Sequence, residues 1–132
     1  MLIDDDREIC EIITAALALE GFTVKTAFDA TRGLELADDD TALVLLDVRL
    51  PGLEPVEFVR RYRERKGRAA APIVVFSASS QIAEFARSVD ADGILCKPFE
   101  LQDLIDLVRR HLDTSGAPSS QPVQPSSHSF FP

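Results

Sequence analysis

The sequence is poor in cysteine, in long apolar runs and in positive charge. Its two cysteines cannot form a disulfide framework, so reduced thiols in the cytoplasm are the simpler interpretation. No apolar run approaches the ~20 residues of a membrane span, and the acidic residues from Asp4 onward leave no signal-peptide core. With 22 acidic and 14 basic residues, the formal net charge is −8, which argues against binding to nucleic-acid phosphates. We therefore expect a cytoplasmic domain that binds a partner or a cation, but neither nucleic acid nor membrane.

The 132 residues suit one domain followed by a segment of different composition. Residues 114–132 hold four of the eight prolines, six serines and no Asp, Glu, Lys or Arg. Such a segment buries too little apolar surface to offset its ordering entropy, so we expect a domain over 1–113 and a disordered Ser/Pro-rich tail over 114–132. Within this tail, Phe130 and Phe131 are compatible with a short docking peptide, although a frayed apolar end is the favoured interpretation.

Short apolar runs alternate with amphipathic stretches through the first 113 residues. The expected strands are residues 1–3, 22–26, 42–46, 73–76 and 93–96, and the expected helices are 7–20, 29–37 and stretches that include 55–62, 82–89 and 101–112. Five strand–helix units predict an α/β fold with a five-stranded parallel sheet. The alternating apolar and polar residues of 22–26 suit a sheet edge, which agrees with the flavodoxin-like doubly wound order 2-1-3-4-5.

Polar side chains follow four of the expected strands, where ligands bind in doubly wound sheets. Asp4, Asp5 and Asp6 follow the first strand, Asp47 the third, Ser77 the fourth and Lys97 the fifth. Converging carboxylates repel one another, so either some are protonated or a cation lies between them. Oxygen ligands without histidine or thiolate favour Mg²⁺. His111 and His128 are far away in sequence, so zinc is unsupported.

The same set of residues suits phosphoryl transfer. A metal ion and the Lys97 ammonium would neutralise the phosphoryl oxygens, while the Ser77 hydroxyl would donate to one of them. Asp47 directly follows a buried apolar run, so a rigid central strand would present its carboxylate for in-line attack. Each residue alone has a simpler explanation, since acids cap helices and lysines lie on surfaces. As an ordered set they favour a site.

From Met1 to about Asp113, the chain resembles the receiver domains of two-component response regulators, of the stand-alone type. The matching residues are Asp4-Asp5, the segment 45–52 (Leu-Leu-Asp-Val-Arg-Leu-Pro-Gly), Ser77-Ala78 and Lys97-Pro98-Phe99. The resemblance implies that Asp47 accepts a phosphoryl group from a histidine kinase or histidine phosphotransfer protein. It also implies Mg²⁺ bound by Asp5, Asp47 and the Arg49 carbonyl, with Asp4 acting through water.

The resemblance further implies that Ser77 senses the phosphoryl group, that Lys97 pairs with it, and that the Lys97–Pro98 bond is cis. A stand-alone domain of this kind is not an enzyme with a separate substrate. It assists only its own phosphorylation and dephosphorylation, and signals to a downstream protein through the face of the fourth helix, fifth strand and fifth helix. An existing two-state equilibrium would shift on phosphorylation.

Some points stay open at this stage. The acidic pair is Asp4-Asp5 by resemblance, which leaves Asp6 at the helix start, but Asp5-Asp6 is an alternative. Pro55 stands where receivers usually have glycine, and Ile94 replaces an aromatic residue that often reports phosphorylation. These departures keep open a receiver-like interaction module that does not use phosphorylation.

Another alternative is a Mg²⁺-dependent phosphohydrolase of the haloacid-dehalogenase type, with the acidic run as its Asp-x-Asp motif.

Two other features of the sequence are better explained by structure than by function. Cys96 is expected to be a small buried strand residue. The basic stretch is expected to be a solvated helix end rather than a contact for an acidic partner; it comprises Arg60, Arg61, Arg63, Arg65, Lys66 and Arg68.

Overall fold

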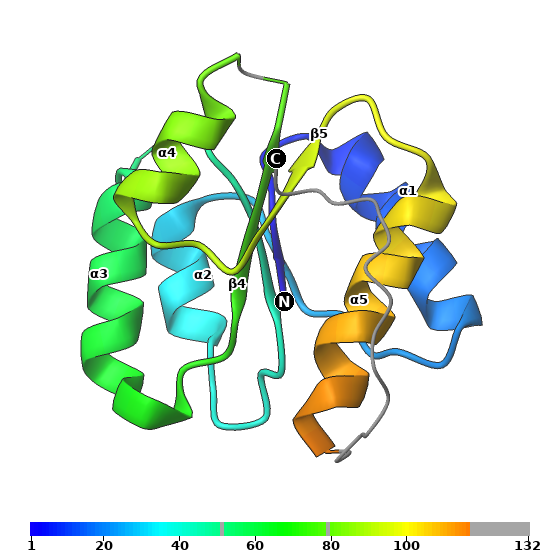
Figure 1. Ribbon diagram of the computed structural model, residues 1–132, viewed down its shortest axis with the longest axis horizontal. Coiled ribbons are helices and arrows are strands. Elements are labelled where there is room, and N and C mark those ends of the chain that lie inside the picture. Colours follow the sequence, from blue (N-terminus) through cyan, green and yellow to red (C-terminus); the bar gives the residue numbers. More distant parts are fainter. Residues whose placement is uncertain (51, 79, 117–132) are drawn as a thin grey trace.

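The computed structural model describes residues 1–50, 52–78 and 80–116, with side chains as far as Leu112. Strands and helices alternate along the chain (Figure 1). The strands are β1 (Leu2–Ile3), β2 (Thr26–Ala27), β3 (Val44–Asp47), β4 (Ile73–Ser77) and β5 (Gly93–Cys96). The helices are α1 (Arg7–Leu19), α2 (Ala30–Leu36), α3 (Pro55–Lys66), α4 (Ile82–Ser88) and α5 (Leu101–Gly116), with a 3₁₀ turn at Gly67–Ala69.

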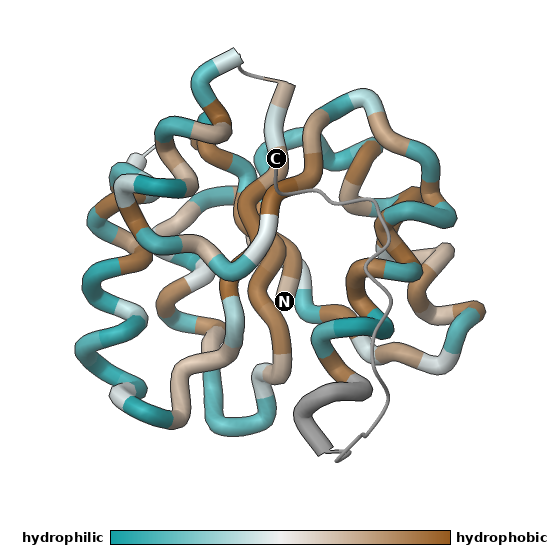
Figure 2. Tube along the Cα trace, viewed as in Figure 1, coloured by the Kyte–Doolittle hydropathy of each residue, from teal (hydrophilic) through white to brown (hydrophobic). Residues whose placement is uncertain are grey.

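The five strands form one parallel sheet of order β2-β1-β3-β4-β5, which confirms the predicted flavodoxin-like doubly wound fold. Helices α2, α3 and α4 lie on one face of the sheet, and α1 and α5 lie on the other (Figure 1). Successive residues of β3 alternate between these two cores: Val44 and Leu46 pack toward the first, and Leu45 toward the second. The central strands are therefore apolar on both faces, and Figure 2 colours them as hydrophobic.

Two predicted strand features differ in the structure. The second strand comprises only Thr26–Ala27 rather than residues 22–26, because its partner β1 is itself only two residues long and pairs at Leu2↔Thr26 and Ile3↔Ala27. Phe22 and Val24 still pack against the α1–α5 core. The prediction that Cys96 is buried is wrong: this last residue of β5 is exposed.

The end of the domain also differs in detail. Helix α5 continues to Gly116, three residues past the predicted boundary at Asp113. Of the predicted tail over 114–132, residues 117–132, which include His128, Phe130 and Phe131, lie outside the described residues. None of the described helices combines the length and the apolar character that crossing a bilayer requires.

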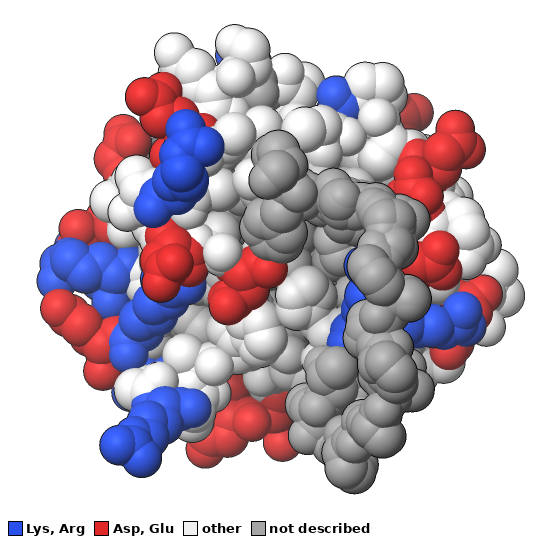
Figure 3. Space-filling view, in the orientation of Figure 1, with Lys and Arg blue, Asp and Glu red and all other residues white. Residues whose placement is uncertain are grey.

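Four arginines of the basic stretch in α3 divide into two pairs, while Lys66 forms an ion pair with Asp39 at 3.2 Å. Arg60 and Arg61 form ion pairs within the helix, with Glu57 and Glu64, so for them the interpretation as solvated side chains holds. Figure 3 shows such basic and acidic side chains alternating over α3.

Two other arginines, Arg63 and the exposed Arg65, also donate to backbone carbonyls of neighbouring segments, which the sequence did not predict. Arg65 donates to the Leu34 carbonyl of α2 at 3.0 Å, and Arg63 donates to Val89 and to Asp90, the latter at 2.9 Å. The last carbonyls of a helix lack partners within it, and α3 lies close enough to satisfy one of α2 and the two that directly follow α4.

Replacing Arg63 with glutamine should lower the free energy of unfolding by about 1–2 kcal/mol, because two carbonyls lose a charged donor. Arg61→Gln is the matched control: it removes an ion pair within α3 and should change stability by less than about 0.5 kcal/mol. Urea unfolding of the two variants measures the difference. Equal losses would show that Arg63 does not hold the end of α4.

Candidate functional site

Three carboxylates meet at the carboxyl ends of β1 and β3. Asp4 directly follows β1 and is fully buried, Asp47 ends β3 and is 4% exposed, and Asp5 is exposed. One carboxylate oxygen from each of the three lies within 4.8 Å of the other two. The strand order brings them together, since β1 and β3 are neighbours that pair at Leu2↔Leu45 and Ile3↔Leu46.

Backbone N–H groups orient the two buried carboxylates. The N–H of Asp6 donates to Asp4 Oδ1 at 3.0 Å, and the N–H of Arg49 donates to Asp47 Oδ1 at 3.0 Å. In each case the donor is two residues farther along the chain, which is the local hydrogen bond typical of aspartate at a turn. The other oxygen, Oδ2, faces Lys97 in both residues. The thiol of Cys10 in α1 supports the same turn by donating to the Asp4 carbonyl at 3.4 Å.

The third acid of the run has a different role. The Asp6 side chain accepts the backbone N–H groups of Glu8 and Ile9, at 3.1 and 3.2 Å, and so caps the start of α1. Asp6 is not part of the carboxylate cluster, which consists of Asp4, Asp5 and Asp47. The geometry therefore favours Asp4-Asp5 as the acidic pair. It does not support the phosphohydrolase alternative, because Asp6, the second aspartate of the Asp-x-Asp motif, lies outside the cluster.

Lys97 lies between the two buried acids. Its Nζ is 3.0 Å from Asp4 Oδ2 and 3.4 Å from Asp47 Oδ2. The ammonium also lies over the ring of Phe76, 4.9 Å from its centroid. The Lys97–Pro98 peptide bond is cis, as the resemblance implies. Lys97 is thus held by residues from β1, β3 and β4.

Ser77 ends β4 beside this cluster. It is 1% exposed, its carbonyl accepts the Lys97 N–H at 3.0 Å, and it is one residue beyond Phe76, the strand partner of Asp47. Arg49 is exposed, and its backbone N–H contacts Asp47. Every residue predicted for the site therefore lies at this edge of the sheet. The binding roles of the Arg49 carbonyl and the Ser77 hydroxyl stay predictions.

Burial and mutual repulsion dominate the electrostatics. Burial, together with the charge of Asp4, raises the pKa of Asp47 to about 6, although the Arg49 N–H and Lys97 act in the opposite direction. Burial lowers the pKa of Lys97, but its hydrogen bond to Asp4 and the charge of Asp47 outweigh this, so the pKa is raised overall. The cluster thus holds three carboxylates, and the one ammonium at it contacts two of them, Asp4 and Asp47. The cluster has an excess of negative charge that a bound cation would relieve.

The donor set fits a Mg²⁺ ion. All three clustered groups are carboxylates, the hard oxygen ligands that this ion prefers. The Cys10 thiol contributes no thiolate, because burial and the neighbouring Asp4 charge raise its pKa to about 11. His111 lies in α5, where its ring contacts the Leu107 carbonyl.

The two departures from the receiver pattern are both accommodated by packing. Pro55 is buried at the first position of α3, where the missing N–H needs no partner. Ile94 is 6% exposed and belongs to the core beneath α4, together with Ile82 and Ala86. An aromatic switch at residue 94 is absent, while the carboxylate cluster and Lys97 are retained.

Known proteins are similar to this chain along most of its length. The family model described as response regulator receiver domain matches residues 1–109. The transcriptional regulatory protein CpxR homolog of Haemophilus influenzae is 32% identical over 122 residues, which cover 91% of this chain and 52% of that protein. The transcriptional regulatory protein TctD of Salmonella typhimurium is 36% identical over 107 residues, covering 79% and 47%. The chain spans about half the length of the curated relatives it matches.

Solved structures show the same similarity in three dimensions. The receiver domain of NtrX from Brucella abortus aligns with a TM-score of 0.75 at 30% identity, covering 86% of this chain and 97% of that one. A CheY-like response regulator receiver domain protein from Methanospirillum hungatei aligns with a TM-score of 0.73 at 25% identity, covering 86% and 91%.

Proposed function

The chain belongs to the response regulator receiver domain family, and on this premise we propose that it is a signalling domain that becomes phosphorylated on Asp47. The donor would be a histidine kinase or histidine phosphotransfer protein. The observation that carries the proposal is the pairing of Lys97 with both buried acids, 3.0 Å from Asp4 and 3.4 Å from Asp47. This arrangement places the Asp47 carboxylate, which would be the nucleophile, next to the positive charge of the Lys97 ammonium.

In the proposed reaction, an Asp47 carboxylate oxygen attacks phosphorus while the bond from phosphorus to the donor's histidine nitrogen breaks. Asp5, Asp47 and the Arg49 carbonyl would hold Mg²⁺ directly, with Asp4 acting through water, and the ion would supply positive charge to the phosphoryl oxygens. Lys97 would pair with one of these oxygens in exchange for its contact with Asp47. The Ser77 hydroxyl would donate a hydrogen bond to another phosphoryl oxygen. The loop after β4 would move with Ser77 toward the phosphoryl group.

We propose that the domain signals by contact with another protein through α4, β5 and α5. The names of the relatives concern proteins about twice as long, so a role in transcription would need a partner or a further module. The acidic net charge supports a protein partner over nucleic acid for the described part. A cytoplasmic location fits this role.

Beryllofluoride tests the proposal without a donor protein, because it mimics a phosphoryl group on aspartate. With Mg²⁺ present, it should shift the amide NMR signals of Asp47, Ser77 and Lys97. The Asp47→Asn variant is the control and should show no such shifts. Unchanged spectra of the wild-type protein would leave only the interaction module that does not use phosphorylation.

The two exposed acids of the run should behave oppositely on substitution. Asp5→Asn should weaken Mg²⁺ binding about tenfold or more and leave stability nearly unchanged, because the side chain is an exposed ligand. Asp6→Ala should cost about 1 kcal/mol of stability through loss of the α1 cap and leave Mg²⁺ binding intact. For each variant, calorimetric titration measures the Mg²⁺ affinity and urea unfolding measures the stability. The reverse pattern would select the Asp5-Asp6 register.

A further inference from the structure

An apolar groove lies between α1 and the segment that follows β5. We call it the α1–α5 groove; its volume is about 470 Å³, and its lining includes Ile9, Ile12, Lys97, Pro98, Phe99 and Leu101. Ile12 is 51% exposed and Leu101 is 39% exposed, so two of the four exposed large apolar side chains in the described part of the chain lie here. Clustered exposed apolar side chains beside a pocket mark a contact surface.

We propose that the Phe130–Phe131 pair of the same chain docks in the α1–α5 groove. Residues 114–132 contain no Asp, Glu, Lys or Arg, so these two phenylalanines can enter an apolar site without bringing a charged side chain along. The groove lining contains no carboxylate, and its one charged group is the Lys97 ammonium, which already lies over an aromatic ring. Aromatic side chains are suited to both features, since they bury a large area and attract cations.

The length of chain between α5 and the pair matches the distance to be spanned. The helix rises about 1.5 Å per residue, so Gly116 lies roughly 22 Å along α5 from Leu101. A random coil of 14 residues, the separation of Gly116 and Phe130 in the sequence, has a root-mean-square span of about 20 Å. A linker whose span matches the gap gives the docking pair an effective concentration on the order of millimolar.

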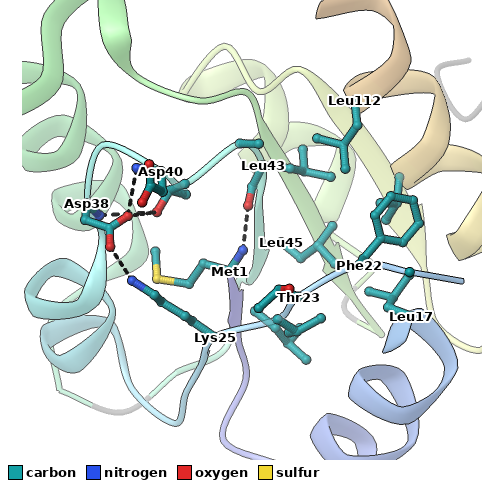
Figure 4. A pocket seen from close by; sticks show the side chains of 16 residues that line it. Met1, Leu17, Phe22, Thr23, Lys25, Asp38, Asp40, Leu43, Leu45 and Leu112 are labelled. Atoms are coloured by element: carbon teal, nitrogen blue, oxygen red, sulfur yellow. Dashed lines mark hydrogen bonds and ion pairs between the residues drawn. The ribbon is translucent and has the colours of Figure 1, made fainter. Parts of the chain in front are cut away.

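A second hollow, of about 430 Å³, fits the pair less well (Figure 4). It lies at the amino ends of the strands, and its labelled residues include Phe22, Leu43 and Leu112. An ion pair between Lys25 and Asp38 lies at this hollow, and none of the four exposed large apolar side chains lines it. The lining of this hollow is more polar than that of the α1–α5 groove, so docking there would bring the two rings against polar groups.

Docking in the α1–α5 groove would place the pair against Lys97, which lines the groove and contacts both buried acids. If Asp47 is the phosphoacceptor, as proposed above, a donor protein would have to displace the pair before it reaches this edge of the sheet. The consequence for phosphorylation rests on the proposed function, whereas the docking does not.

Tryptophan fluorescence tests the docking directly, because the chain contains no tryptophan and Phe131→Trp supplies a single reporter. In the full chain, the emission of this tryptophan should be blue-shifted and independent of protein concentration. Adding Ile12→Asp should abolish the blue shift. Val56→Asp is the matched control, because Val56 is 50% exposed on α3, and it should leave the emission unchanged.

Three results would overturn the proposal. An emission typical of solvent-exposed tryptophan would show that the pair is undocked. A blue shift that grows with protein concentration would assign the groove to a second copy of the chain. A blue shift that survives Ile12→Asp but disappears in Phe22→Asp would place the pair in the other hollow. None of these readouts involves phosphate, so they are independent of whether Asp47 is phosphorylated.

Discussion

Replacing Asp47 with asparagine should raise the stability of the metal-free protein by about 2 kcal/mol at pH 7. The carboxylate is 4% exposed and lies beside Asp4, and its pKa is raised to about 6. Ionising it in the folded protein therefore costs more than in the unfolded chain. Asparagine removes that charge, and its side-chain oxygen can still accept the Arg49 N–H. Urea unfolding in the presence of a chelator measures the gain.

The pH dependence has a definite sign. A carboxyl whose pKa is higher in the folded state binds protons more tightly there, so its destabilising effect is absent below about pH 4 and complete above about pH 6. The stability difference between Asp47→Asn and the wild-type protein should therefore grow between those values. Asp92 is not part of the cluster and accepts the Ile73 N–H at the start of β4 at 2.8 Å, so Asp92→Asn is a control for removing an acid elsewhere and should give no gain that grows with pH. A loss of stability in Asp47→Asn at pH 7 would mean that Asp47 is a structural residue.

Replacing Lys97 with methionine should have the opposite effect, a loss of about 2–4 kcal/mol at pH 7 without metal. The substitution removes the ammonium from between two buried acids and leaves both without their counter-charge. Because the remaining acids repel one another, stability should recover as the pH falls. Mg²⁺ should also restore part of it, since an ion that binds only the folded state stabilises that state.

The Lys25 ion pair supplies the control for this second prediction. Lys25 and Asp38 are both partly exposed, so Lys25→Met should change stability by less than about 1 kcal/mol and should show no rescue by Mg²⁺. Equal effects of Lys25→Met and Lys97→Met would contradict the view that Lys97 balances the charge of the site.

Much of the site could be predicted from the sequence because a parallel sheet collects the ends of its strands at one edge. Once the runs before Asp4, Asp47 and Lys97 are recognised as strands of one parallel sheet, their ends lie at the same edge, with β1 beside β3 and β5 two strands away from β3. The capping role of Asp6 was likewise open to prediction, since a residue just before an amphipathic stretch tends to cap it. Local patterns and topology sufficed for these features.

Features that depend on three-dimensional neighbours could not be predicted. Arg63 and Arg65 resemble surface residues in the sequence, and their role appears only because α2 and α4 end beside α3. Phe76 has no sequence signal as the ring beneath Lys97, since it belongs to an unbroken apolar strand. The exposure of Cys96 has the same cause, because what covers the last residue of a strand depends on the path of the following loop.

The most direct test of the central claim is mass spectrometry of the protein after incubation with acetyl phosphate and Mg²⁺. The account predicts a gain equal to one phosphoryl group, located on Asp47 by peptide mapping and absent when a chelator replaces Mg²⁺. It would be contradicted by no gain in mass, or by a gain that persists in the Asp47→Asn variant.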